Sequence, residues 1–431
     1  MNLTTTFLTL GRKAKRALTG SHAAPVYPCP VRRIERVALG QRVCAMTFDD
    51  GPCLLPPSAD PGGKPLTLQL METLEAHGAR GTFDVVGDTA GNYPDKPGRE
   101  GTAAWGGLRY DHYPDIGRDD QGGAAHAPEL IARMLEMGHA VTNHTYAHVL
   151  FGRKNVVYGQ RAVRAGLEDT VADLRRLHDL LERDFGYTMT LARPPHYVDR
   201  MADGFSSYDA YAMLGYQYMA ASYDGAGWMP LDSYRQEVDA MVKPMETLLT
   251  SNPDALCGQI IFQKDGFNMA RRTPVADGLG AQLDLLARYG YRVVTVPELL
   301  TMSPCADVKP GEAGFDAARR LLDRGLCAAY RDNTLRLDQP ANAADAAALL
   351  FGREGVLNRA AEGRPIAKGE HPCAGAFEAL RAAGGPALTP DAALTGPVLD
   401  ELCRVRFDAA PGLTGSLSRR DLLLAVDGLC S

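Results

Sequence analysis

The sequence lacks the features that mark nucleic-acid-binding, membrane-spanning and disulfide-rich proteins. Its 46 Lys and Arg stand against 52 Asp and Glu, with the two signs interspersed, so we expect no basic surface for nucleic acid. No run of about 18 apolar residues is present that could span a membrane. The nine cysteines are scattered without a Cys-x-x-Cys pair, which argues against a zinc knuckle or a disulfide framework. What remains is a folded globular chain of 431 residues, long enough for one large domain and one small one.

Residues 1–35 are interpreted as an N-terminal extension. The apolar run Thr6–Leu10 is short and is followed, not preceded, by basic residues, which is the wrong order for a secretory signal. Together with cysteines expected to be reduced, this predicts a cytoplasmic protein and leaves the cell envelope as an open alternative, because a non-standard export route would leave the same pattern.

From residue 42 to residue 295, short apolar runs alternate with longer segments of helical periodicity, such as residues 66–77, 129–137, 163–185 and 278–288. This alternation is typical of a parallel sheet or barrel built from βα units, so residues 36–302 are predicted to form one α/β barrel domain. Residues 87–128 break the rhythm, and we place this long loop over the active-site face. The predicted strands are Arg42–Phe48, Gly81–Val86, Ala140–Asn143, Met189–Ala192, Tyr218–Ser222, Gln259–Phe262 and Arg292–Thr295.

Two polar clusters follow predicted strands, where sites of such folds lie. Asp49 and Asp50 end a strand before a Gly-Pro turn, and adjacent carboxylates are commonly stabilised by a cation. His144 and His148 follow another strand at a spacing that puts both imidazoles on one side of a helical turn. Each cluster alone could be a turn or a solvated helix face. Together, one carboxylate and two imidazoles predict a catalytic metal site with open positions for water and substrate.

These clusters also carry a resemblance to a known family. Over about residues 42–300 the chain resembles the NodB-type polysaccharide deacetylases, carbohydrate esterase family four. The resemblance implies a distorted (β/α) barrel in which Asp50, His144 and His148 bind a divalent metal, usually Zn²⁺, with Co²⁺ or Ni²⁺ as alternatives. The four segments that match the family's first four motifs, in order, are Thr47–Pro52, His144–His148, Arg193-Pro194-Pro195-His196-Tyr197 and Asp224-Gly225-Ala226-Gly227-Trp228.

The resemblance also implies roles for the surrounding residues. Asp49 would be the general base that takes a proton from the attacking water, and Arg193 would hold it. Asp224 would tune the general acid, while Trp228, with Tyr197 and Pro195, would line the substrate pocket. A backbone N–H near His196 or Tyr197 would help to hold the oxyanion. Without the resemblance, Arg193 could equally be an ordinary ion-pair partner and Trp228 a core residue.

The fifth family motif departs from its pattern, because Lys264 stands where the family has the His that protonates the leaving amine. An ammonium is a poor acid unless its pKa of about 10.4 is lowered, and an expected ion pair with Asp224 would raise it. His196, which replaces a family Tyr, and His112 or His126 of the long loop are the other candidates. We favour a loop His, since imidazole has a suitable pKa.

Residues 303–431 are predicted to form a small all-α domain, because the composition shifts to Ala, Leu, Arg and Asp after Pro304. Residues 315–350 resemble an S-layer homology repeat, with fainter echoes over 376–402 and 407–429 that suggest three repeats. This resemblance implies docking to a cell-wall polymer. A helical bundle that packs on the barrel or mediates self-association is an equally good interpretation.

The sequence thus predicts a metal-dependent hydrolase that removes N-acetyl or O-acetyl groups. Its substrate would be an acetylated amino-sugar glycan or a small-molecule sugar precursor. A second hypothesis is a carbohydrate-recognition pseudoenzyme that keeps the metal but has lost the general acid. A third is a barrel hydrolase that cleaves a different C–N amide bond.

Overall fold

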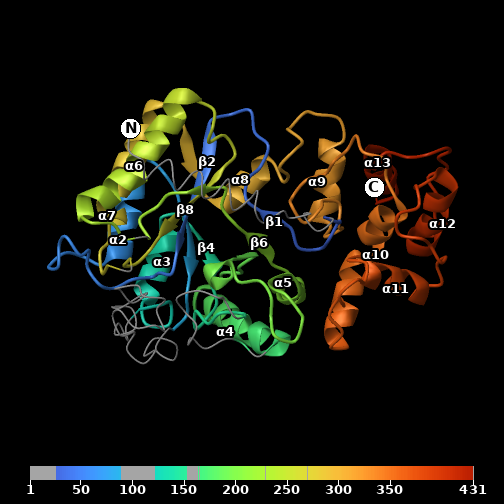
Figure 1. Cartoon of the computed structure of the whole chain (residues 1–431), viewed down its shortest axis with the longest axis horizontal. Helices are drawn as coiled ribbons and strands as arrows, with labels where there is room; N and C mark the ends of the chain where they lie inside the picture. Colours follow the sequence, from blue (N-terminus) through green and yellow to red (C-terminus); the bar gives the residue numbers. More distant parts are fainter. Residues whose placement is uncertain are drawn as a thin grey trace.

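The computed structural model describes residues 26–88, 122–152, 164, 166–228, 230–268 and 270–430. At the centre of this part lies a parallel sheet in the order β1-β6-β5-β4-β3-β2-β8-β7, with β9 pairing β2 (Figure 1). β2 is buried along its whole length, as expected for a parallel strand covered on both faces. The strands are β1 (Arg33–Ile34), β2 (Val43–Asp49), β3 (Thr82–Val85), β4 (Ala140–Asn143), β5 (Leu191–Ala192), β6 (Gln217–Met219), β7 (Tyr223–Asp224), β8 (Ile260–Lys264) and β9 (Arg292–Val294).

The connection between β6 and β7 shows that the sheet curls. Three residues, 220–222, separate these strands, yet β6 lies near one end of the pairing order and β7 at the other. A chain of this length reaches at most roughly 14 Å, so the two ends of the sheet must approach each other. The fold is therefore a distorted (β/α) barrel, which confirms the predicted fold class. The apolar run predicted as one strand, Tyr218–Ser222, contributes only its first two residues to β6, and β7 begins directly after it.

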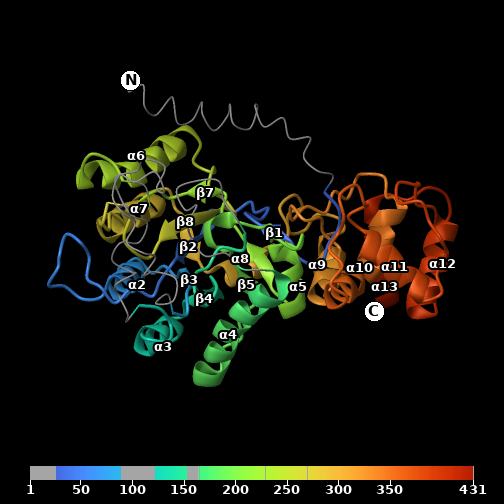
Figure 2. The same cartoon turned by 60° about the horizontal axis from the view of Figure 1, so that its bottom comes forward.

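Helices follow one another around the outside of the barrel, and Figure 2 shows their succession from α6 and α7 to α2, α3 and α4. Helices close to α2, α3, α4 and α7 were predicted from their periodicity, whereas α5 and α6 were not. No helix in the described part is both long enough and apolar enough to cross a membrane. The barrel helices are α2 (Leu66–Ala76), α3 (Pro128–Glu136), α4 (Leu167–Phe185), α5 (Ser207–Leu214), α6 (Tyr234–Ser251), α7 (Val275–Arg288) and α8 (Val296–Met302).

A row of polar side chains crosses four neighbouring strands. Lys264 on β8 and Asp84 on β3 are both in register with Asp49 on β2, and Asp84 is in register with Thr142 on β4. Residues in register on parallel strands point to the same face of the sheet. We call these four residues the polar row. All four are buried, with at most 4% of any of them exposed, so the strand register gathers charges inside one end of the barrel.

The C-terminal part is helical, as predicted, and has a hydrophobic core of its own. Its helices are α9 (Phe315–Asp323), α10 (Ala343–Ala361), α11 (Ala374–Ala382), α12 (Gly396–Phe407) and α13 (Arg419–Cys430). Ala341, Leu394 and Leu417 each lie just before one of three helices, α10, α12 or α13. Their backbones form a closed ring: Ala341 N–H donates to Leu417 O, Leu417 N–H to Leu394 O, and Leu394 N–H to Ala341 O, at 2.9–3.0 Å. Three equivalent turn–helix units therefore meet at one point, while the likeness to S-layer homology repeats stays a prediction.

The segment before the barrel joins the two parts. β1 pairs with β6, and on the other side Arg33 N–H donates to the carbonyl of Arg331 at 2.7 Å. The guanidinium of Arg32 donates to the carbonyl of Pro304 at 2.6 Å and to Asn333 at 2.8 Å. Residues 33–34 thus belong to the sheet, which corrects the interpretation of residues 1–35 as a separate extension. These residues join the sheet through long-range strand pairing, and a strand of two residues is too short to show a sequence pattern that predicts it.

Candidate metal and catalytic site

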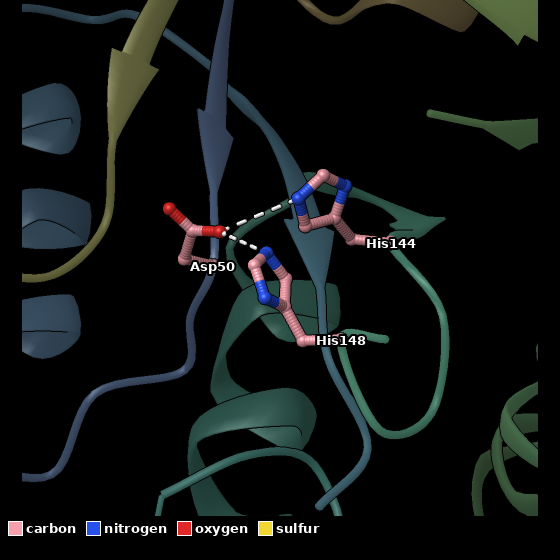
Figure 3. Close-up of side chains that lie close together, drawn as sticks. All are labelled: Asp50, His144 and His148. Atoms are coloured by element: carbon pink, nitrogen blue, oxygen red, sulfur yellow. Dashed lines mark ion pairs between the residues drawn. The ribbon is translucent and has the colours of Figure 1, made fainter. Parts of the chain in front are cut away.

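Three predicted metal ligands meet at the C-terminal ends of β2 and β4. Asp50 directly follows β2, and His144 directly follows β4. One carboxylate oxygen of Asp50, Oδ1, lies 3.3 Å from Nε2 of His144 and 2.9 Å from Nε2 of His148 (Figure 3). All three residues are buried, with 7%, 2% and 2% of their surface exposed. The structure therefore brings together the three side chains that the sequence selected.

The donor set fits a divalent metal. One carboxylate oxygen and two imidazole nitrogens lie within 4.8 Å of one another, and this combination of ligands is typical of catalytic zinc sites. Burial alone would raise the pKa of Asp50, but Lys264 and the two imidazoles hold it well below its usual range. Asp50 is thus an anion that needs a positive partner. The Nδ1 atom of His144 faces away from Asp50, 2.9 Å from the carbonyl oxygen of Arg193.

The loop that carries the two histidines is not a helical turn, which corrects the prediction from their spacing. Thr145 and His148 have left-handed backbones, with φ of 74° and 52°, and such residues cannot belong to a regular α-helix. Asp50, His196 and Tyr197 are also left-handed, with φ of 84°, 55° and 56°. Backbone strain of this kind clusters at functional sites, where the surrounding structure enforces it.

Asp49, the predicted general base, is held by Arg193 as the resemblance implied. The guanidinium of Arg193 contacts the carboxylate of Asp49 and also donates to the Thr47 hydroxyl at 3.0 Å and to two backbone carbonyls. Arg193 is fully buried. Burial raises the pKa of Asp49 to about 7, although Arg193 opposes this rise. A carboxylate with this pKa is matched to proton transfer near neutral pH.

Lys264 faces Asp50. Its ammonium lies 2.5 Å from Oδ2 of Asp50 in a fully enclosed position. Burial lowers the pKa of Lys264 from its ordinary value, although Asp50 opposes the change. Asp224 accepts hydrogen bonds from the indole N–H of Trp228 at 3.1 Å and from the Ala226 N–H at 3.0 Å. The described ion pair of Lys264 is thus with Asp50, and the expected pair with Asp224 stays a prediction.

The third motif forms a short 3₁₀ turn, Pro195–Tyr197, after β5. The ring of His196 lies edge-on to that of His148, with centroids 5.5 Å apart, so this histidine is next to the metal ligands. Tyr197 N–H donates to the carbonyl of Pro194 at 3.0 Å and is thereby committed within the turn, which weakens the expectation that it would hold an oxyanion. The guanidinium groups of Arg33 and Arg193 lie 5.4 Å and 5.6 Å from the centroid of its ring.

The remaining predicted residues lie at different depths. Pro195 is buried, whereas Trp228 is partly exposed. His126 lies just before α3, with Nε2 3.3 Å from Oδ1 of Asp88 and 35% of its side chain exposed. His112 lies outside the described residues.

The sequence analysis missed two buried carboxylates beside this site. Asp84 is fully buried, and its Oδ2 lies 2.8 Å from Nδ1 of His144. Asp265 is also fully buried and accepts a hydrogen bond from the hydroxyl of Thr67 at 2.7 Å, and burial raises its pKa to about 7. A signal for Asp84 was present, because the triplet Thr-Phe-Asp at residues 47–49 recurs at residues 82–84.

Comparison with known proteins agrees with this geometry. Residues 36–210 match the family model for polysaccharide deacetylase. This segment of the chain is thus similar to polysaccharide deacetylases. A curated relative, the peptidoglycan-N-acetylmuramic acid deacetylase PdaC of Bacillus subtilis (strain 168), is 26% identical over 162 residues. That match covers 38% of this chain but only 23% of the relative's length.

Solved structures resemble part of this chain at low similarity. Peptidoglycan deacetylase PdaC from Bacillus subtilis is 22% identical with a TM-score of 0.38, over 62% of this chain and 93% of that one. The chitin deacetylase of Colletotrichum lindemuthianum is 19% identical with a TM-score of 0.41, over 66% and 94%. A pseudoenzyme of the same esterase family from Bacillus anthracis is 13% identical with a TM-score of 0.40, over 62% and 68%.

Proposed function

We propose that the protein is a metal-dependent hydrolase that removes N-acetyl or O-acetyl groups from an amino-sugar glycan or its precursor. One observation carries the proposal: the buried ligand set of Asp50, His144 and His148 lies beside a carboxylate, Asp49, that Arg193 fixes in place. The match to the deacetylase family and the deacetylase activity named for PdaC support the substrate class.

Each residue of the site has a separate proposed role. Asp50, His144 and His148 would hold a divalent metal, proposed to be Zn²⁺, which when bound lowers the pKa of water and polarises a carbonyl oxygen. Asp49 accepts a proton from the attacking water, because its pKa of about 7 leaves it partly ionised at neutral pH. Arg193 keeps the Asp49 carboxylate oriented. Trp228, tethered to Asp224, and Tyr197 with Pro195 are proposed to border the acyl group.

Three of the described residues are candidates for the general acid. Lys264 is buried with a lowered pKa, which favours proton donation, but its ammonium is engaged with Asp50. His196 lies beside His148 and is the candidate nearest to the ligands, whereas His126 contacts Asp88. We therefore propose His196 as the first residue to test, and Lys264 as the second.

A different function, a carbohydrate-recognition pseudoenzyme, is favoured by one specific observation. The Lys264 ammonium already supplies a positive charge to Asp50, the carboxylate that a metal would bind. Such a lysine could balance the buried carboxylates without turnover. Hydrolysis of a different C–N amide bond is the third candidate. For the helical C-terminal part we propose docking to a cell-wall polymer, with a purely structural role as the alternative.

The test is to measure metal content together with acetate release from a panel of N-acetylated and O-acetylated sugars and glycans, with and without added Zn²⁺ or Co²⁺. Bound metal and metal-dependent acetate release would support the deacetylase. Bound metal without acetate from any panel member would favour the pseudoenzyme or the other amide hydrolase.

Variants separate the roles within this experiment. Asp49→Asn should abolish turnover and keep the metal, whereas His148→Ala should lose both. His196→Ala should reduce turnover more than Lys264→Ala if His196 is the acid. His77→Ala, at the exposed C-cap of α2, is the matched control and should leave both readouts unchanged. A fully active Asp49→Asn variant would contradict the mechanism.

A further inference from the structure

Asp84 is a buried carboxylate to which the mechanism above assigns no role. It lies in the polar row, between Asp49 on one neighbouring strand and Thr142 on the other, and none of its surface is exposed. An isolated buried carboxylate costs several kcal/mol unless hydrogen-bond donors compensate it. The contacts of its two oxygens therefore indicate why the protein keeps it there.

Each oxygen of Asp84 has a distinct neighbour. Oδ1 accepts a hydrogen bond from the hydroxyl of Thr142 at 2.6 Å. Oδ2 lies 2.8 Å from Nδ1 of His144, an ion-pair contact whose angle does not meet the hydrogen-bond criterion, and the hydrogen bond of Nδ1 goes to the carbonyl oxygen of Arg193. The Nδ1 atom must carry a hydrogen here, because the carboxylate on one side and the carbonyl of Arg193 on the other are both acceptors.

A hydrogen on Nδ1 determines what the other face of the ring offers. With Nδ1 protonated, the neutral imidazole presents a lone pair at Nε2, the atom that points toward Asp50. A carboxylate behind a metal-binding imidazole fixes its tautomer and orientation and makes it a stronger ligand. We infer that Asp84 is a positioning residue that holds His144 in the form required for metal binding, an inference that rests on the proposed metal-dependent function.

The same atoms allow one other interpretation, a second metal ion held by Asp49, Asp84 and His144. The contacts argue against it. The guanidinium of Arg193 already contacts Asp49, and Nδ1 of His144 is shared with the Arg193 carbonyl. These three residues are thus joined by a hydrogen-bond and ion-pair network whose positive charge comes from Arg193. One metal per chain is the expected stoichiometry.

The test compares Zn²⁺ affinity and stoichiometry of the full chain and of Asp84→Asn by calorimetric titration, alongside metal-free thermal unfolding. Asparagine keeps the shape and loses the charge, so we expect Zn²⁺ binding to weaken about 10- to 100-fold while one site remains. Asp88→Asn, four residues further along and partly exposed, is the matched control and should change affinity by less than about twofold. A metal-free melting temperature close to that of the parent would show that the loss is not general unfolding.

Three outcomes would overturn the inference: unchanged affinity in Asp84→Asn, two Zn²⁺ per parent chain with one in the variant, or a parent chain that binds no metal. The last would also remove the proposed metal site. If Asp84→Asn does not fold, Thr142→Val carries the test. It frees Oδ1 of Asp84 and should weaken Zn²⁺ binding measurably, and unchanged affinity would again contradict the role. A parent chain that binds Zn²⁺ but releases no acetate overturns only the proposed function.

Discussion

Replacing Arg193 by Met should destabilise the protein in a way that depends on pH. The substitution leaves the buried carboxylate of Asp49 without its partner and removes donors from the Met219 and Ala220 carbonyls. Breaking a buried ion pair by removing one member costs about 3–5 kcal/mol. For a chain of this length, at about 2 °C per kcal/mol, the melting temperature should fall by roughly 6–10 °C near pH 8.

The pH dependence follows from Asp49. Arg193 lowers the pKa of that carboxyl, which burial raises to about 7, so without Arg193 the pKa rises further. A buried acid with a raised pKa stays protonated and uncharged in the folded state at pH 5, so the loss of stability should be smaller there than at pH 8. For the same reason, the acid limb of any acetate-release profile should move to higher pH.

The assay is thermal unfolding followed by circular dichroism at pH 5 and pH 8. Arg183→Met is the control, because Arg183 pairs with Asp184 on the surface and 69% of its side chain is exposed. Its effect should stay within about 0.5 kcal/mol. Adding Asp49→Asn to Arg193→Met removes the uncompensated charge and should restore part of the loss at pH 8. An Arg193→Met melting temperature equal to that of the control, or no recovery in the double variant, would refute the reasoning.

Three further outcomes are expected. Arg419→Met removes the fully buried partner of Asp345, 3.0 Å away, and should cost about 3–5 kcal/mol in unfolding experiments, whereas the partly exposed Arg420→Met should change little. Asp265→Asn removes a buried acid whose pKa is raised to about 7. Between about pH 4 and 7 the folded parent binds more protons than the unfolded parent, so the parent's free energy of unfolding falls as the pH rises. The variant lacks this loss, so its free energy of unfolding should increase relative to that of the parent over the same range. Zn²⁺ at 100 times its dissociation constant should stabilise the parent by about 2.7 kcal/mol and should not stabilise His148→Ala, which differential scanning calorimetry can check.

Local patterns predicted much of the barrel because they report burial directly. β4 coincides with the predicted strand Ala140–Asn143, and β2 is displaced by one residue, since a strand buried on both faces reads as a continuous apolar run. Periodicity missed α5 and α6. α6 contains Pro244, which lowers its apparent helical propensity, and α5 is only eight residues long.

The candidate metal ligands were selected because strand ends meet at one edge of a parallel sheet, a rule that needs no coordinates. Their backbone was not predicted correctly. The spacing of His144 and His148 suggested a helical turn, but left-handed Thr145 and His148 bring the two Nε2 atoms to Asp50 instead. Such conformations are imposed by surrounding contacts, for example the hydrogen bond from Thr145 N–H to the Asn143 side chain at 2.9 Å.

The sequence by itself determined the strand and helix periods, the chemistry of the ligand set and the replacement of the expected acid by Lys264. These follow from residue types and short spacings. Only the tertiary structure decided the partners of the buried charges. Strand register sets Lys264, Asp49 and Asp84 side by side. Because all three are buried, each is stabilised by a specific neighbour: Lys264 contacts Asp50, Asp49 contacts Arg193, and Asp84 contacts His144. The register is fixed by residues far apart in the chain, which is why no local pattern could reveal it.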